Sequence, residues 1–304
     1  MRIPASVVGI SVGPREQEID ARWLMAYAAA LGEHAPEYLD TARPDGVIAH
    51  PLFPVCYEWP LALDVRAKAL PDEIAVRGVH ATHDLTVHRA PRPGDRLSTT
   101  ATVRALERRA PGACMVLRME TVDAAGRPVT TTDYGSLYLG VDCDGDASPG
   151  TERARAASQE RPHRSLSPQE RGQGEGWWST EVPVPATLAH VYTECARIWN
   201  PIHTDRAVAL AAGLPDIILH GTATLALGVS QVLHHEQAGS ALTVRGLSCR
   251  FGAMVRLPSR ILVRGRDDGS SDGRLATFEV LTEDGRPAVR DGRVRLGDRR
   301  SDSR

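Results

Sequence analysis

The sequence predicts an α+β fold built from two similar units in tandem. In each half of the 304-residue chain, segments with apolar residues at helical spacing come before a series of strand-like segments. A polar segment separates the two halves. Helices followed by runs of strands, rather than strict alternation of the two, are typical of α+β domains. We therefore predict two tandem antiparallel sheets, each wrapped around one long apolar helix.

The first half begins with two predicted helices. Over residues 21–32, Trp23, Tyr27 and Leu31 recur at helical spacing. A loop rich in Pro and Gly follows, and the apolar segment over residues 57–69 predicts the second helix. Four predicted strands complete this half, over residues 78–87, 96–107, 114–123 and 128–140.

The second half repeats this order of elements. A helix is predicted over residues 186–197, a short one ending near Ala212, and a long apolar one from Gly221 to about His234. Four predicted strands follow, over residues 241–255, 259–266, 275–282 and 287–296. Because one such unit alone would leave a sheet edge unpaired, we expect the two sheets to pair edge to edge.

The segment over residues 144–176 predicts a boundary between the two units. It is rich in Gly, Ser, Pro, Arg and Glu and has almost no large apolar residues. Such a composition buries too little apolar surface to offset the entropy of ordering the chain. We therefore predict an N-terminal unit over residues 1–143, a flexible linker over 144–176 and a C-terminal unit over 177–304.

Composition excludes several classes of function. The formal net charge of -2 gives no long-range attraction to nucleic acid or anionic membranes. The five cysteines are dispersed without a Cys-x-x-Cys pair, so neither a disulfide framework nor a structural zinc site is expected. No segment approaches the ~20 apolar residues of a membrane span, and the N-terminus lacks the features of a signal peptide. We expect a cytoplasmic protein without metal.

The segment over residues 191–221 carries the most specific motif. It contains Asn-Pro-Ile-His over residues 200–203, an Ala-rich stretch ending in Gly213, and Ile-Leu-His-Gly over residues 218–221. In these residues and their spacing the chain resembles the MaoC-like (R)-specific enoyl-CoA hydratases of the double hotdog type. The resemblance implies a double hotdog fold. It also implies that the second half is catalytic and that the first half is a non-catalytic partner that shapes the acyl pocket.

The resemblance also implies the chemistry. Adding water to a double bond beside a thioester carbonyl needs a base, an acid, and stabilisation of the enolate-like oxygen. In the family an Asp and a His share one water, and an N–H at the start of the central helix polarises the carbonyl. By position, His203 is the acid/base, Asn200 orders the loop and hydrogen-bonds the site, and Gly221 supplies the N–H. The substrate would be a thioester of coenzyme A or acyl carrier protein, with no separate cofactor.

The chain departs from the family motif at one catalytic position. The motif Asp should lie two residues before Asn200, where this chain has Ile198. Losing one of two acid/base groups commonly lowers a rate by ~10²–10⁴-fold. Glu194 lies four residues before Ile198, so a continuous helix would place both on one face. We therefore expect Glu194 as the candidate replacement for the missing carboxylate.

Further substrate contacts are expected near the motif and on one strand, from Ile198, Trp199, Asp205, His220 and Arg250. Three of these residues also have other readings. Asp205 can cap the following helix or orient the imidazole, and His220 can hold the turn into the central helix. Arg250 either meets the phosphates of coenzyme A or belongs to a solvated strand face.

Ile198 leaves alternative functions open. The chain can be a hotdog protein that binds acyl thioesters without hydrating them, or the inactive partner of an active subunit. A thioesterase on the same fold is a third reading, since a fold does not determine chemistry. A homodimer is also expected, because double hotdog proteins often pair again.

Overall fold

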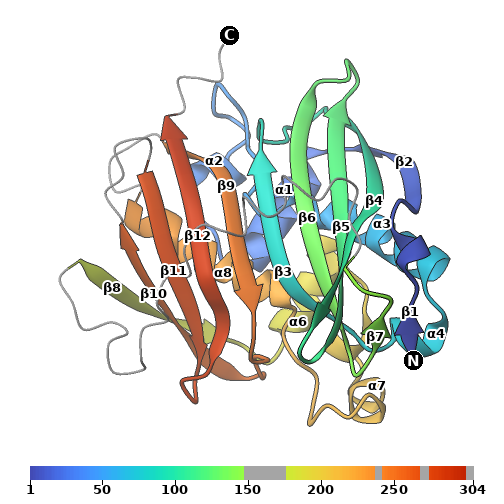
Figure 1. The fold of residues 1–304 in the computed structure, drawn as a ribbon. Coiled ribbons are helices and arrows are strands. Elements are labelled where there is room, and N and C mark those ends of the chain that lie inside the picture. Colours follow the sequence, from blue (N-terminus) through green and yellow to red (C-terminus); the bar gives the residue numbers. More distant parts are fainter. Residues whose placement is uncertain (147–175, 237–241, 268–273, 299–304) are drawn as a thin grey trace.

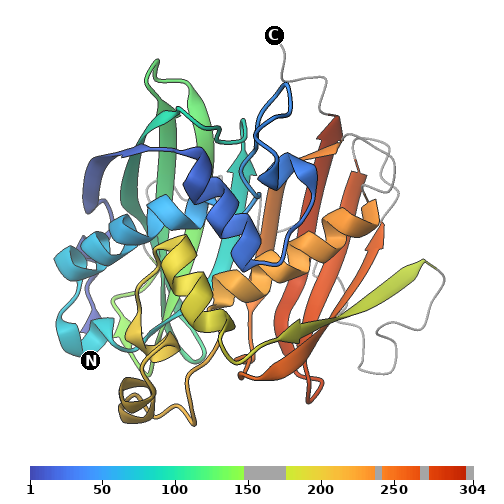
Figure 2. The ribbon, with the colours of Figure 1, turned by 180° about the vertical axis from the view of Figure 1, so that it is seen from behind.

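The computed structural model describes residues 1–146, 176–236, 242–267 and 274–298. They form one large antiparallel sheet with helices on one of its faces. Figure 1 looks onto the face of the sheet that the described helices leave open, and Figure 2 shows the helices crossing the opposite face. This arrangement confirms the predicted α+β class.

The first half contributes seven strands, a short 3₁₀ turn and four helices. In chain order they are β1 (Arg2–Ile3), η1 (Ala5–Val7), β2 (Ser11–Glu18), α1 (Ala21–Ala30), α2 (Pro36–Leu39), α3 (Pro54–Ala69), α4 (Asp72–Ala75), β3 (Gly78–Val87), β4 (Arg96–Arg109), β5 (Gly112–Asp123), β6 (Pro128–Leu139) and β7 (Asp142–Cys143).

The second half repeats the pattern of long elements within its described residues. In chain order they are β8 (Trp177–Val184), α6 (Leu188–Ala196), η2 (Pro201–His203), α7 (Arg206–Ala211), α8 (Gly221–Glu236), β9 (Leu242–Phe251), β10 (Ser259–Asp267), β11 (Arg274–Thr282) and β12 (Pro287–Asp298). The two central helices, α3 and α8, each have sixteen residues.

The ten strands of the main sheet follow the order β2-β4-β5-β6-β3-β9-β12-β11-β10-β8. The second half therefore repeats the strand order of the first in reverse, as two copies related by a twofold rotation would. Strands β3 and β9 join the halves by antiparallel pairing from Thr82 opposite Arg250 to Thr86 opposite Gly246. The expected edge-to-edge pairing of the two sheets is confirmed.

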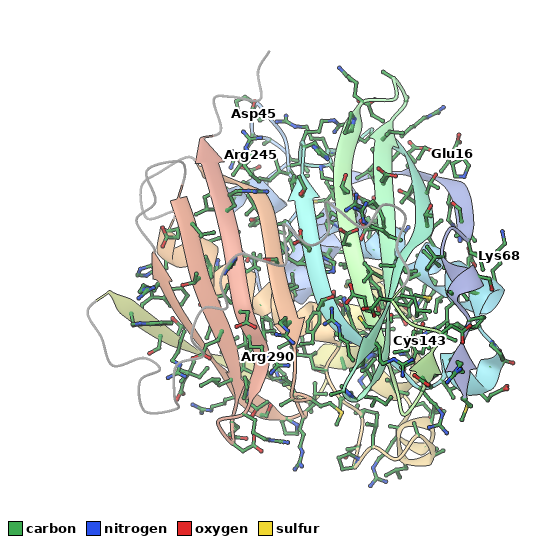
Figure 3. All side chains as sticks on the ribbon, viewed as in Figure 1. Glu16, Asp45, Lys68, Cys143, Arg245 and Arg290 are labelled. Carbon is green, nitrogen blue, oxygen red and sulfur yellow. The ribbon has the colours of Figure 1, made fainter. Side chains whose placement is uncertain are left out.

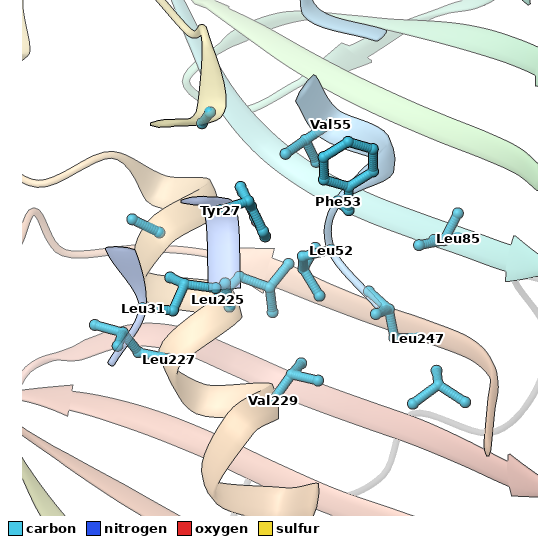
Figure 4. Close-up of a cluster of buried hydrophobic side chains, with 14 of the residues drawn as sticks. Tyr27, Leu31, Leu52, Phe53, Val55, Leu85, Leu225, Leu227, Val229 and Leu247 are labelled. Carbon is cyan, nitrogen blue, oxygen red and sulfur yellow. The ribbon is translucent and has the colours of Figure 1, made fainter. Parts of the chain in front are cut away.

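A hydrophobic core extends across this junction. Leu85 of β3 lies opposite Leu247 of β9, and both side chains are buried. They belong to one cluster with Tyr27 and Phe53 of the first half and Leu225 of α8, as Figure 4 shows. Because this cluster draws on both halves, burial of its apolar surface holds one half against the other.

The two strands at the edges of the sheet, β2 and β8, were not predicted from the sequence. Strand β2 contains Pro14, and β8 contains Pro183 and ends at Val184. Proline cannot donate a backbone hydrogen bond, so it is tolerated in an edge strand but weakens a strand prediction. Both strands are also largely exposed, which removes the apolar alternation that marks a half-buried strand.

The predicted linker falls mainly on residues 147–175, which lie outside the described residues. Strand β7 ends at Cys143 and β8 begins at Trp177, and the division into domains at these residues stays a prediction. Within the described residues, none of the helices combines the length and the apolar character needed to cross a membrane.

Candidate active site

The loop over residues 197–205, between α6 and α7, carries the Asn-Pro-Ile-His motif and is called the motif loop here. It borders a cavity of about 490 Å³ that both halves line. The second half contributes Ile198, Asn200, Ile202, His203, His220 and Gly221 to its wall. The first half contributes one face of α3 and parts of β3, β5 and β6, including Glu58, Arg66, His80, Met119 and Tyr134. A pocket of this size can enclose an acyl chain. The site is therefore a joint product of the two halves.

His203 presents one nitrogen as an acceptor. Its Nδ1 lies 2.8 Å from the carbonyl oxygen of Ile218. A carbonyl oxygen can only accept, so Nδ1 carries the proton and Nε2 of a neutral ring does not. Burial lowers the pKa of His203 to about 4, although the hydrogen bond to Ile218 acts in the opposite direction. The ring is therefore neutral at pH 7, with Nε2 available as a base.

His220 packs against His203 and keeps it in place. The two rings are stacked with centroids 3.7 Å apart. Nε2 of His220 lies 3.2 Å from the hydroxyl of Thr193 on α6. Burial, and then the neighbouring His203, lower the pKa of His220 well below its ordinary value. A neutral His220 supports the structural reading of this residue, and it also lines the cavity.

Asn200 and Gly221 occupy the positions that the motif requires. The backbone N–H of His203 donates to the carbonyl of Asn200 at 3.1 Å, which closes the turn that carries the imidazole. Gly221 is the first residue of α8, so its N–H has no acceptor within the helix. The helix dipole favours negative charge at this end. A Cβ on Gly221 would lie 3.4 Å from the Phe251 ring, at ordinary van der Waals distance.

Ile198 fills the place of the missing carboxylate with an apolar side chain. It is 4% exposed, lines the cavity and belongs to the core that spans the two halves. The motif position therefore contributes no acid or base.

The structure does not bring Glu194 to this site. Helix α6 ends at Ala196, and Arg197 after it is left-handed, with φ 58°. The expectation that Glu194 and Ile198 share one helical face is therefore wrong, because the helix stops between them. Glu194 is exposed, and the cavity wall does not include it.

Two further predicted contacts, Asp205 and Trp199, also lie outside the cavity wall. Asp205 caps α7, accepting hydrogen bonds from the N–H groups of Ala207 and Val208, as the capping alternative predicted. Trp199 is 60% exposed. These two residues were expected to contact substrate, but the loop directs their side chains elsewhere.

Arg250 lies on the solvated face of the sheet. It is exposed and pairs with Arg290 on β12, which Figure 3 labels. Its neighbours in β9, Cys249 and Phe251, face the buried side, and alternation along a strand turns Arg250 the other way. The expected contact of Arg250 with substrate phosphates at this cavity is therefore wrong, and the alternative of a solvated strand face holds.

Glu58 is a cavity residue that sequence reasoning missed. It is 2% exposed, and Oε1 accepts a hydrogen bond of 2.6 Å from the hydroxyl of Thr132. Burial raises the pKa of Glu58 to about 7, although this hydrogen bond lowers it. The signal was an acidic residue among the apolar residues of the first half of α3, where Val55, Cys56, Tyr57 and Leu61 are also buried. Among the described residues, no group of three or more His, Cys, Asp or Glu side chains could hold a metal ion.

Comparisons with known proteins match this architecture. Residues 179–286 match the model of the MaoC like domain, and residues 6–132 match that of the FAS1-like dehydratase domain region. A MaoC-like dehydratase from Phytophthora capsici superposes with a TM-score of 0.79 at 19% identity, over 97% of each chain. A Mycobacterium tuberculosis protein described as having a double hotdog fold has a TM-score of 0.61 at 17% identity, over 95% of this chain and 96% of that one.

A curated relative matches a smaller part of the chain. A fatty acid synthase β subunit of Monascus ruber is 35% identical over 97 residues, which are 32% of this chain. The match spans only 5% of that much longer protein. Each of the two family matches lies within one half of the chain, and the structural matches cover both halves. The chain therefore joins a region that matches the FAS1-like dehydratase domain to a region that matches the MaoC like domain, in one double hotdog fold.

Proposed function

We propose that this protein is a hydro-lyase that adds or removes water across a 2-enoyl thioester. One observation carries the proposal. The neutral His203, with Nε2 unprotonated, and the N-terminus of α8 line one cavity of about 490 Å³. A base and an oxyanion donor in one cavity are two of the three groups that hydration requires.

The proposed roles follow from this geometry. The thioester carbonyl would accept the N–H of Gly221, where the dipole of α8 stabilises charge developing on the oxygen. His203 would take a proton from the attacking water through Nε2. The mostly apolar wall between α3 and the sheet would hold the acyl chain and exclude bulk water. The acyl carrier would be coenzyme A or acyl carrier protein, and no group other than the substrate thioester is required.

A second function is favoured by one observation. Ile198 is buried and apolar where the motif has an acid, so the second half alone has a single acid/base group on the motif loop. A protein in this state would bind acyl thioesters without hydrating them, or act as the inactive partner of another subunit. A thioesterase is a third candidate, and it would release free thiol.

The test is direct. Purified protein is incubated with crotonyl-CoA while the enoyl-thioester absorbance and the release of free thiol are followed. We expect loss of the enoyl absorbance without thiol release, and loss of this activity in His203→Ala. Binding of butyryl-CoA without hydration of crotonyl-CoA or longer enoyl-CoA would favour the binding protein. Thiol release would favour the thioesterase.

We also propose that the protein is cytoplasmic and forms a homodimer. Support comes from composition and from the habit of double hotdog proteins to pair again. Light scattering of the purified protein measures the oligomeric state, and a mass of one chain, 32.9 kDa, would contradict the homodimer.

A further inference from the structure

We propose that Glu58, from the first half, is the second acid/base group of the site on the motif loop of the second half. It would act in place of the motif carboxylate that Ile198 replaces. This inference rests on the proposed hydration reaction. It assigns the FAS1-like half a catalytic residue, where the sequence implied only a wall of the pocket.

The composition of the cavity wall supports this role. Among the described residues that line the cavity, Glu58 is the only Asp or Glu. It lies on the face of α3 that also presents Val55, Ala62 and Arg66 to the cavity, at the spacing expected for one side of a helix. The reaction needs a second titrating group, and the wall offers one carboxyl.

The orientation of the Glu58 carboxyl also supports this role. Oε1 is held by the hydroxyl of Thr132 on β6. Oε2 has no hydrogen-bond partner among the described residues, and it is not completely shielded from solvent. An unpaired carboxyl oxygen at a buried position is costly unless a ligand or water meets it. Thr132 therefore leaves one oxygen of this cavity-lining residue without a partner in the described part of the chain.

The start of α3 lies beside the motif loop. Val55 and Glu58 of this helix line the same cavity as Ile198 and Asn200 of the motif loop. Figure 2 shows that α3 and α8 both begin near the middle of the molecule and run outward in opposite directions. Glu58, in the second turn of α3, thus lines the cavity that the motif loop also borders.

The charges around the cavity are compatible with a carboxyl that exchanges a proton near neutral pH. Besides Glu58, the titratable residues of the wall are Arg66 on α3, His80 on β3, Tyr134 on β6, and His203 and His220 of the second half. Burial lowers the pKa of both His80 and His203, so neither adds a positive charge at pH 7. Glu58, with its pKa raised to about 7, is then partly protonated in the working range.

In the proposed step, Nε2 of neutral His203 takes a proton from water, and the water oxygen forms the bond to C3 of the enoyl thioester. The C2–C3 π pair moves toward the thioester carbonyl, whose oxygen accepts the N–H of Gly221. C2 then takes the proton of the Glu58 carboxylic acid. A proton returns through solvent from the His203 imidazolium to the Glu58 carboxylate, so the net change is addition of one water.

The experiment compares Glu58→Gln and Glu58→Asp with Glu194→Gln as the matched control, because Glu194 is exposed and outside the cavity wall. All are full-length chains, assayed with crotonyl-CoA over pH 5 to 9 and for binding of unreactive butyryl-CoA. We expect Glu58→Gln to lower kcat by ~10²–10⁴-fold with butyryl-CoA affinity changed by less than about threefold. Wild-type kcat/KM should fall above about pH 7, and the residual activity of Glu58→Gln should lack that fall.

The other possible results of this experiment would contradict the proposed role of Glu58. A kcat within about twofold of wild type in folded Glu58→Gln overturns the assignment, and so does a low kcat that keeps the wild-type fall above pH 7. If circular dichroism shows that Glu58→Gln does not fold, the folded variant Glu58→Asp provides the test instead. A Glu58→Asp variant with the kcat and the pH profile of the wild type would overturn the assignment. No hydration by the wild type refutes the proposed function, and the role of Glu58 with it.

Discussion

The two central helices begin in different ways, and the difference separates the roles of the two halves. Helix α8 begins at Gly221, whose N–H has no acceptor within the helix, whereas α3 begins at Pro54, which has no N–H. A thioester oxygen can therefore be bound at α8 but not at the first residue of α3. The half without this donor instead contributes a buried carboxyl, Glu58, to the wall of the shared cavity.

A buried histidine precedes each of these helices, His50 before α3 and His203 before α8, and the two rings carry their proton on different nitrogens. In His50, Nδ1 accepts the N–H of Leu52, so Nε2 carries the proton and donates to the hydroxyl of Ser230. In His203 the proton is on Nδ1, and Nε2 is left as a base. Burial lowers the pKa of both rings to about 4. Two histidines with the same charge thus have opposite tautomers, and only one of them can accept a proton in the cavity.

The largest effect is expected from removing that base. His203→Ala should lower kcat for crotonyl-CoA by ~10²–10⁴-fold, about 3–5 kcal/mol of transition-state stabilisation. The matched variant His50→Ala should keep kcat and lower the free energy of unfolding by ~1–3 kcal/mol, because Ser230 and Leu52 lose a buried partner. Steady-state kinetics and urea unfolding measure the two quantities. Equal losses of kcat in both variants would contradict the division of roles.

A second prediction concerns a substitution that gives α8 the same first residue as α3, a proline. Gly221→Pro removes the N–H, while proline is tolerated at the first position of a helix. We expect kcat to fall by ~10²–10³-fold, the usual effect of losing one oxyanion donor. Far-UV circular dichroism should be unchanged. The reciprocal variant Pro54→Gly should leave kcat unaltered, and a kcat of Gly221→Pro near that of wild type would exclude this N–H from the reaction.

A third prediction concerns the junction between the halves. Leu85 is 1% exposed and faces Leu247 across the β3–β9 pair. Leu85→Ala should lower the free energy of unfolding by ~2–5 kcal/mol, the range for a buried leucine. Urea unfolding should remain a single transition, because the core cluster includes residues of both halves. Two separate transitions would show that the halves unfold independently.

The smallest effect is expected from an ion pair between the halves. Nε2 of His234 on α8 lies 3.0 Å from Oε2 of Glu33, which follows α1. The hydrogen bond to Glu33 raises the pKa of His234 above 6.5. This stabilisation is therefore full below pH 6.5 and is lost as pH rises through the raised pKa.

His234→Gln should lower stability at pH 6 by less than about 1 kcal/mol, since His234 is half exposed, and by less still at pH 9. A double-mutant cycle with Glu33→Gln isolates the coupling. An equal effect of His234→Gln at both pH values would contradict a charged pair.

Much of this protein could be predicted from its sequence. Helical spacing and strand-like runs predicted the tandem α+β units and most long elements, because these patterns are local. The motif over residues 200–221 predicted which half holds the imidazole and the N–H. The same motif showed that Ile198 leaves a catalytic position without an acid.

Other features were decided only by tertiary structure. The end of α6 at Ala196 removed Glu194 from the site, and strand alternation turned Arg250 toward solvent. Glu58 reaches the cavity because the β3–β9 junction brings α3 beside a loop about 140 residues away in sequence. No local pattern encodes a contact at that separation. The nitrogen of His203 that carries the proton was likewise decided by one carbonyl, that of Ile218, which only the folded chain brings within hydrogen-bonding distance.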